Sequence, residues 1–212
     1  MSKTSTARLN VGLVGLGRLG RAYAKYLAAH LDSARLVGVA DVDAGAVDAV
    51  ARAFDVPLAV TDPAALIDDP SVDAVVIASP TSTHGDITRI AAHAGKPTFC
   101  EKPPAIDLAS AVAMQQVVAD SGIFFQLGFM RRFDPGYAAA KARLESGDMG
   151  DAVVFRSSSR DQSRPSVEYA NPAMSGGMII DMGIHDFDLA RWFMGDVATV
   201  QTMGGVLVYP EI

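Results

Sequence analysis

The sequence contains very little cysteine and histidine, and this shortage excludes several kinds of site. Its single cysteine, Cys100, allows neither an internal disulfide nor a cysteine-based metal cluster. The four histidines lie at positions 30, 84, 93 and 185, without the spacing of metal ligands. We therefore expect no disulfide and no metal site, and we interpret Cys100 as a small core residue.

Clusters of basic residues and long apolar runs are also missing. The net charge is −6, so the chain is poorly suited to bind nucleic acid or an anionic membrane. No apolar run could span a bilayer, and the opening "MSKTSTARLN" lacks the apolar stretch of a secretory signal. These absences predict a cytoplasmic protein with neither nucleic acid nor a membrane as a partner.

Apolar residues, in contrast, make up half of the 212 residues, enough for a substantial core. Up to about residue 129, short apolar runs typical of strands alternate with helical segments. This alternation predicts an α/β fold of the Rossmann type, a doubly wound parallel sheet with helices on both faces. The predicted strands are Leu9–Val14, Arg35–Ala40, Ala74–Ala78, Thr98–Cys100 and Phe124–Phe129, and the predicted helices are Leu19–Ala29, Ala44–Phe54, Asp86–Ala94 and Leu108–Ser121.

The pattern changes after "RRFDPGY", where proline and glycine interrupt it. A helix over Tyr137–Glu145, a strand over Ala152–Ser158 and a final β-rich run predict an incomplete α+β domain. A strand around Gly205–Tyr209 would lack partners and leave an open edge. We predict two domains, residues 1–130 for dinucleotide binding and residues 131–212 for the substrate and oligomer contacts.

A glycine-rich turn follows the first predicted strand. "VGLVGLGRLG" contains G-x-G-x-x-G, formed by Gly15, Gly17 and Gly20 with Arg18 and Leu19 between them. In dinucleotide sites the first glycine makes the turn, the second admits the pyrophosphate and the third lets helix and strand pack closely. The position between a strand and a helix favours this interpretation over an ordinary turn.

An acidic residue ends the second predicted strand, about 20 residues beyond the turn. Asp41 is placed to accept hydrogen bonds from the adenosine ribose, and its charge would repel a 2′-phosphate. The predicted cofactor is therefore NAD. Arg18 is a basic residue that could reach a 2′-phosphate, but a position along the pyrophosphate or in solvent is favoured. Asp43 is either a second ribose ligand or a turn acid in solvent.

Two later loops are predicted at the carboxyl ends of strands, where open α/β sheets bind their ligands. The loop in "VVIASPTSTHGD" contains Thr83, either a helix N-cap or a cofactor contact, and His84, either a site residue or an exposed one. In "PTFCEKPPAIDL", Lys102 follows a buried strand and precedes two prolines that restrict its backbone. A lysine there could donate to a substrate oxygen as negative charge develops.

The segment "GMIIDMGIHDFDLARWFMG" places polar residues within an apolar stretch. Asp181, His185 and Asp188 would share one face of a continuous helix. They are interpreted either as a proton-handling face, with Asp181 orienting the imidazole, or as a core histidine beside a capping acid. Asp188 is the more structural member, which satisfies backbone groups or orients the helix.

These motifs together resemble the glucose–fructose oxidoreductase/inositol dehydrogenase/MocA (Gfo/Idh/MocA) family of oxidoreductases. "SPTSTH", "CEKP", "GFMRRFDPGY" and "GGMIIDMGIHDFDLARW" carry the resemblance, which is nearest to the inositol dehydrogenase branch and runs from Val11 onward. It implies NAD-dependent oxidation of a secondary hydroxyl of a cyclic polyol or sugar, with myo-inositol as the first expectation. Relatives in this family are longer, so the chain is expected to be C-terminally truncated.

The resemblance also implies roles for individual residues. Lys102, Asp181 and His185 would surround the reacting hydroxyl and the nicotinamide, with Arg131 and Asp161 as further polyol contacts. The cofactor would be lined by Gly15, Gly17, Arg18, Leu19, Gly20, Asp41, Ser79, Thr81, His84, Glu101 and Lys102. Either His185 or Lys102 could be the base. The alternatives are a truncated, non-catalytic dinucleotide-binding module and a family member that acts on another sugar, and a homo-oligomer would form through the second domain.

Overall fold

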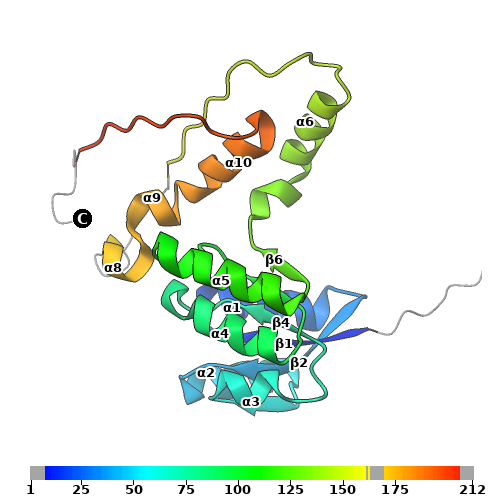
Figure 1. Cartoon of the computed structure of the whole chain (residues 1–212). Coiled ribbons are helices and arrows are strands. Elements are labelled where there is room, and N and C mark those ends of the chain that lie inside the picture. The colour runs from blue at the N-terminus through cyan, green and yellow to red at the C-terminus, as the bar shows by residue number, and fades with distance from the viewer. Residues whose placement is uncertain (1–7, 161, 163–169, 206–212) are drawn as a thin grey trace, which may run out of the picture. The chain divides into compact units, whose positions relative to one another are not determined.

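The computed structural model describes residues 8–160, 162 and 170–205. The chain divides into two compact units between Gly128 and Phe129. Figure 1 shows the first unit as a sheet flanked by helices and the second as helices joined by long connections.

A six-stranded parallel sheet forms the centre of the first unit, in the order β3-β2-β1-β4-β5-β6. This order is that of the Rossmann fold, whose ligand crevice lies where the strand order reverses, between β1 and β4. The predicted α/β class and doubly wound parallel sheet are confirmed. The strands are β1 (Leu9–Val14), β2 (Ala34–Ala40), β3 (Leu58–Val60), β4 (Ala74–Ile77), β5 (Thr98–Cys100) and β6 (Phe125–Leu127).

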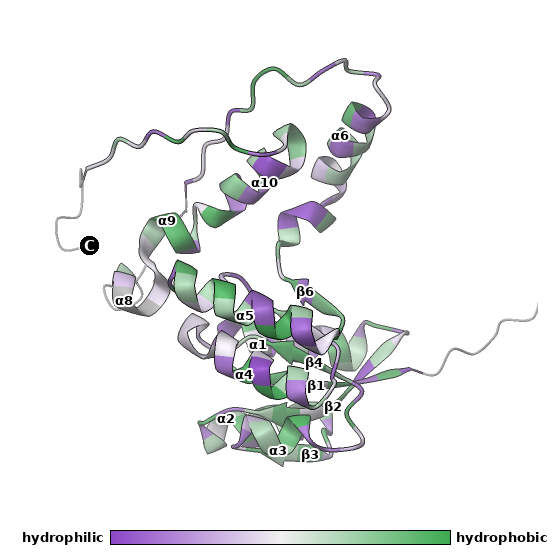
Figure 2. Ribbon diagram, viewed as in Figure 1, coloured by the Kyte–Doolittle hydropathy of each residue, from purple (hydrophilic) through white to green (hydrophobic). Residues whose placement is uncertain are grey.

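Alternate side chains of the sheet enter two separate cores. Val11 and Leu13 of β1 pack in one core with helices α1 and α2, whereas Val14 packs in the other with α3, α4 and α5. Helices α4 and α5 carry both hydrophobic and hydrophilic residues in Figure 2, as expected of helices that cover a sheet. The helices of this unit are α1 (Arg18–Ala29), α2 (Ala44–Phe54), α3 (Pro63–Ile67), α4 (Thr81–His93) and α5 (Leu108–Ser121).

Three local features of the first unit differ from the sequence prediction. The short elements β3 and α3 were not predicted, because three and five residues are too few to show a period. Helix α4 begins at Thr81 rather than Asp86, since Pro80 occupies its N-cap. The segment "TSTHG", predicted as a loop, is therefore the first turn of a helix.

All the described elements of the second unit are helices. They are η1 (Met130–Phe133), α6 (Pro135–Glu145), α8 (Pro172–Ser175), α9 (Gly177–Asp181) and α10 (Ile184–Met194). The strand predicted over Ala152–Ser158 is wrong, because this segment pairs with no other strand in the described part of the chain. Val153 and Val154 are exposed there, and Phe155 stacks on Phe193. The β-rich run at Gly205–Tyr209 lies outside the described residues except for its first glycine.

Candidate active site

The glycine-rich turn has the backbone geometry that a dinucleotide requires. Gly15 has a φ of +92°, and a Cβ there would lie 2.4 Å from the backbone nitrogen of Ser79. A Cβ on Gly20 would lie 1.8 Å from the carbonyl oxygen of Gly15, so only glycine lets α1 approach β1 this closely. In contrast, a Cβ on Gly17 would meet nothing within 4 Å. The open space at Gly17, at the N-cap of α1, suits a phosphate group.

Asp41 lies directly after β2, and one of its two hydrogen bonds to backbone N–H groups reaches the glycine-rich turn. Its Oδ2 accepts from the backbone N–H of Leu16 at 2.6 Å, and its Oδ1 accepts from that of Asp43 at 2.9 Å. Asp43 itself caps α2 by accepting from the N–H groups of Gly45 and Ala46. Of the two roles expected for Asp43, the turn acid is therefore the one that the structure supports.

The end of β4 leads into Ser79 and then α4. The hydroxyl groups of Ser79 and Thr83 lie 2.7 Å apart, and the Thr83 hydroxyl donates to the carbonyl oxygen of Pro80. Thr83 is not the N-cap, because Pro80 holds that position without a side-chain bond. His84 is 1% exposed, so the exposed position considered for it is wrong. Burial lowers the pKa of His84, and this effect outweighs the contacts with the carbonyl oxygens of Pro103 and Ser79, which raise it.

Glu101 and Lys102 follow β5 at the same edge of the sheet. The carboxylate of Glu101 is buried and accepts hydrogen bonds from the Tyr23 hydroxyl of α1 and from the backbone N–H of Lys102. Burial, followed by the bond to Glu101, raises the pKa of Tyr23. Gly128 leaves room for this carboxylate, since a Cβ there would lie 3.0–3.1 Å from its atoms. Cys100 is fully buried, as expected, and burial raises its pKa to about 12.

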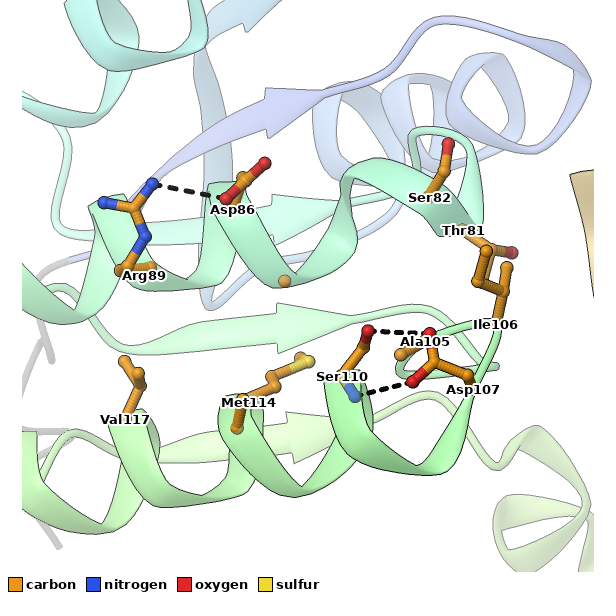
Figure 3. A pocket seen from close by; sticks show the side chains of 12 residues that line it. Thr81, Ser82, Asp86, Arg89, Ala105, Ile106, Asp107, Ser110, Met114 and Val117 are labelled. Atoms are coloured by element: carbon orange, nitrogen blue, oxygen red, sulfur yellow. Dashed lines mark hydrogen bonds and ion pairs between the residues drawn. The ribbon is translucent and has the colours of Figure 1, made fainter.

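A cavity of about 310 Å³ opens between α4 and α5 (Figure 3). Thr81 is the one predicted cofactor residue among those that line it. The ion pair between Arg89 and Asp86 and the bonds from Ser110 to Asp107 occupy its polar wall. Among the residues that the structure describes, no group of three histidine, cysteine or acidic side chains could hold a metal ion.

In the second unit, Asp181 and His185 lie on two successive helices. Asp181 is the last residue of α9, and His185 is the second residue of α10. The prediction of one continuous helical face is wrong, because Met182 and Gly183 separate the two helices. A Cβ on Gly183 would lie 2.7 Å from the carbonyl oxygen of Ile179, so the chain can turn closely only with glycine there. His185 is buried and lies at the start of α10, beside this turn.

Asp186, the residue after His185, accepts hydrogen bonds from three side chains. The sequence analysis did not identify Asp186 as a site residue. Its carboxylate accepts hydrogen bonds from Arg131 at 2.6 Å, Ser157 at 2.6 Å and Ser159 at 2.5 Å. Burial alone would raise the pKa of Asp186, but the two serines and then Arg131 hold it below its usual range. The signal for this cluster was the pair "RR" together with "SSS", but contacts across 55 and 27 residues cannot be assigned from spacing.

Asp188 has a structural partner, as expected. Arg132 donates to both of its carboxylate oxygens, at distances between 2.7 and 3.2 Å. The Asp188 side chain is only 7% exposed, and the guanidinium also lies over the ring of Trp192 at 5.6 Å from its centroid. This pair ties α10 to η1.

The remaining predicted residues divide between the units. Lys102 belongs to the first unit, and Asp181, His185 and Arg131 belong to the second, so their convergence around a substrate stays a prediction. Asp161 lies outside the described residues. In the part of the chain that the structure describes, no helix has the length and apolar character needed to cross a membrane.

Comparison with known proteins places this geometry in a family. Residues 9–129 match the model for the GFO/IDH/MocA oxidoreductase family, NAD-binding Rossmann fold, and residues 137–211 match the model for the GFO/IDH/MocA C-terminal domain. The chain is 40% identical over 204 residues to scyllo-inositol 2-dehydrogenase (NAD(+)) of Bacillus subtilis, covering 96% of this chain and 59% of that protein. It is 38% identical to myo-inositol 2-dehydrogenase of Thermotoga maritima, over 96% of this chain and 60% of the relative.

Solved structures agree with these matches. Scyllo-inositol dehydrogenase from Lactobacillus casei, crystallised with bound NAD(H) and scyllo-inositol, superposes with a TM-score of 0.81 at 37% identity. The superposition covers 89% of this chain and 57% of the crystallised one. The chain thus spans about 60% of the length of the relatives that it matches.

Proposed function

This chain belongs to the GFO/IDH/MocA oxidoreductase family, and from that premise we propose that it oxidises a secondary hydroxyl of a cyclic polyol with NAD⁺. The observation that carries the proposal is the shared sheet edge of the first unit. The glycine-rich turn, Asp41 and Lys102 all follow the carboxyl ends of parallel strands there. That edge is where a Rossmann sheet holds a dinucleotide, so Lys102 would lie near the reactive end of the cofactor.

The residues present fit NAD. Gly15 and Gly20 allow the turn to pack closely, and the open space at Gly17 can take the pyrophosphate. The acid after β2, Asp41, suits a free ribose better than a 2′-phosphate. NAD⁺ would accept the hydride from the carbinol carbon. The other cofactor contacts proposed are Arg18, Leu19, Ser79, Thr81 and Glu101, whereas His84, buried between two backbone carbonyl oxygens, would act on the cofactor edge only through the loops that it contacts.

The protein's own residues would manage the proton. We assign His185 as the group that accepts the hydroxyl proton, because imidazole is suited to this near neutral pH. Asp181 would orient the ring and stabilise its charged form, and Lys102 would donate to the oxygen as negative charge develops. Lys102 as the base with His185 as the donor is the second assignment.

Arg131 and Asp161 are the proposed polyol contacts in the second unit. The Nη1 of Arg131 is committed to Asp186, and its Nη2 lies 3.4 Å from the Ser159 hydroxyl. Such a fixed guanidinium would present its remaining N–H groups in one direction, which suits a ring with several hydroxyl groups. A homo-oligomer through the second unit belongs to the same proposal.

A second candidate function is binding of NAD without turnover. The segment 152–158, predicted to be a strand, pairs with no strand in the described residues. This observation favours a dinucleotide-binding module in which the second unit does not complete a substrate site. A family member that acts on a sugar other than inositol is the third outcome considered.

One experiment separates these functions. The chain is mixed with NAD⁺ or NADP⁺ and a panel of polyols and sugars that includes myo-inositol and scyllo-inositol, and the absorbance at 340 nm is followed. NADH formation with an inositol is the expected result. Reduction with a different sugar only would reassign the substrate, and a calorimetric NAD⁺ titration that shows binding without reduction would support the module.

A further inference from the structure

His84 connects the two loops that follow β4 and β5. It projects from the first turn of α4, is 1% exposed and has both ring nitrogens within hydrogen-bond distance of backbone carbonyl oxygens. Nδ1 lies 2.7 Å from the oxygen of Pro103, and Nε2 lies 2.9 Å from the oxygen of Ser79. The imidazole therefore bridges the ends of two neighbouring parallel strands, within the first unit.

The tautomer of His84 determines to which of the two loops the ring can donate a hydrogen bond. A neutral imidazole has one N–H, so it can donate to only one of these two carbonyl oxygens. Burial lowers the pKa of His84, and among the nearby charged groups Glu101 opposes that shift and Lys102 adds to it. The lowered pKa favours the neutral ring near pH 7, and of the two contacts the one between Nδ1 and the Pro103 oxygen is the shorter.

Lys102 lies between two fixed points of this network. On one side, its backbone N–H donates to the Glu101 carboxylate at 3.1 Å, and that carboxylate also accepts from Tyr23. On the other side, the carbonyl of the next residue, Pro103, faces His84. The backbone at Lys102 is thus held from α1 and from α4.

We propose that His84 is a positioning residue for Lys102, which acts by donating its Nδ1–H to the Pro103 carbonyl oxygen. The part of this inference that concerns turnover rests on the proposed function, because it gives Lys102 a role at the substrate. The inference that His84 holds the backbone next to Lys102 does not depend on the proposed function. A displacement of about 1 Å at a reacting group can lower a rate about 100-fold, so such a brace matters for catalysis.

Two substitutions separate the two ring nitrogens. The amide nitrogen of asparagine lies near the position of Nδ1, and that of glutamine lies near the position of Nε2. His84→Asn can therefore keep the bond to Pro103, whereas His84→Gln can keep only the contact with Ser79. Ile87→Ala, at a buried residue of the same helix that belongs to the core, is the matched control for a general loss of stability.

Hydrogen exchange of the Lys102 backbone amide, measured by NMR on the 212-residue chain, gives a readout that is independent of activity. We expect exchange in His84→Asn and Ile87→Ala to stay within about threefold of the wild type, and exchange in His84→Gln to be about tenfold or more faster, as for a locally opened loop. Equal protection in both His84 variants would overturn the proposal. Equally fast exchange in all three variants would do so too, because it would report only weaker packing.

Kinetics then test the consequence for turnover. In His84→Gln we expect kcat to fall about 10- to 100-fold with a nearly unchanged KM for NAD⁺, and in His84→Asn we expect a smaller fall. Unchanged kcat in His84→Gln, despite fast exchange at Lys102, would overturn the positioning role. Failure of the proposed function is distinguishable, since the wild-type chain would then form no NADH while the exchange pattern still decides whether His84 holds the loop.

Discussion

The carboxylate of Asp41 accepts a 2.6 Å hydrogen bond from the backbone N–H of Leu16. The residue expected to select the cofactor is therefore also part of the support for the glycine-rich turn. A substitution at Asp41 changes both the cofactor contact and the turn, and the two effects need different variants.

Asp41→Ala should weaken NAD⁺ binding about 10- to 100-fold, the scale of hydrogen bonds to a charged group. Asp41→Asn keeps an acceptor for Leu16 but removes the charge that repels a 2′-phosphate. It should therefore lose less affinity for NAD⁺ and narrow the difference between NAD⁺ and NADP⁺. Calorimetric titration of both cofactors checks this. Equal losses in the two variants would show that the backbone bond contributes nothing.

The glycines allow folding and binding to be separated. Gly20→Ala places a Cβ 1.8 Å from the Gly15 carbonyl oxygen and should lower both the melting temperature and the affinity for NAD⁺. Gly17→Ala meets nothing within 4 Å, so it should melt normally and yet bind NAD⁺ more weakly. Thermal melts and cofactor titrations of the two variants give the comparison. Wild-type binding by Gly17→Ala would contradict the assignment of the pyrophosphate position.

The Arg132–Asp188 pair should contribute to stability and not to cofactor binding. Arg132→Ala leaves the nearly buried Asp188 carboxylate without its bidentate donor. We expect the second unit to lose about 1–3 kcal/mol in its free energy of unfolding, as for bonds between charged groups. Chemical denaturation checks this, with Arg191→Ala as the exposed control. A change in NAD⁺ affinity in Arg132→Ala would contradict the structural role.

Asp186 should make the second unit sensitive to acid. Because the folded state lowers its pKa, the stabilisation from Asp186 is complete above the ordinary aspartate pKa, about 3.9, and is lost as the pH falls through the folded value. Asp186→Asn should therefore lower the melting temperature most at neutral pH, and the difference from the wild type should shrink toward low pH. A difference that does not change with pH would mean that the carboxylate charge is unimportant.

The sheet and its cofactor edge could be predicted from the sequence because their signals are local. Short, mostly apolar runs mark β1, β4 and β5, and the turn glycines and Asp41 lie at fixed distances from the first of them. Strand Ala152–Ser158 was predicted wrongly for a physical reason, since an apolar run becomes a strand only with a partner to pair with. The prediction of one continuous helix through Asp181 and His185 was wrong because the turn at Gly183 interrupts it.

The supporting contacts could not be predicted, because each joins residues far apart in the chain. Tyr23 reaches Glu101 across 78 residues, and Arg132 reaches Asp188 across 56. Residue types at these positions are consistent with many surface roles, and only the fold selects the partner. His84 is the intermediate case, because its motif was visible in the sequence and its burial between two carbonyl oxygens was not.

The proposed function requires that Lys102 and His185, from different units, act on one substrate hydroxyl. Its most direct test is the kcat/KM for inositol of Lys102→Ala, His185→Ala and the double variant, with NAD⁺ affinity measured in parallel. We expect each single variant to lose about 100-fold or more with NAD⁺ affinity nearly unchanged, and the double variant to lose far less than the product of the two. Near-normal rates in both single variants would contradict the claim.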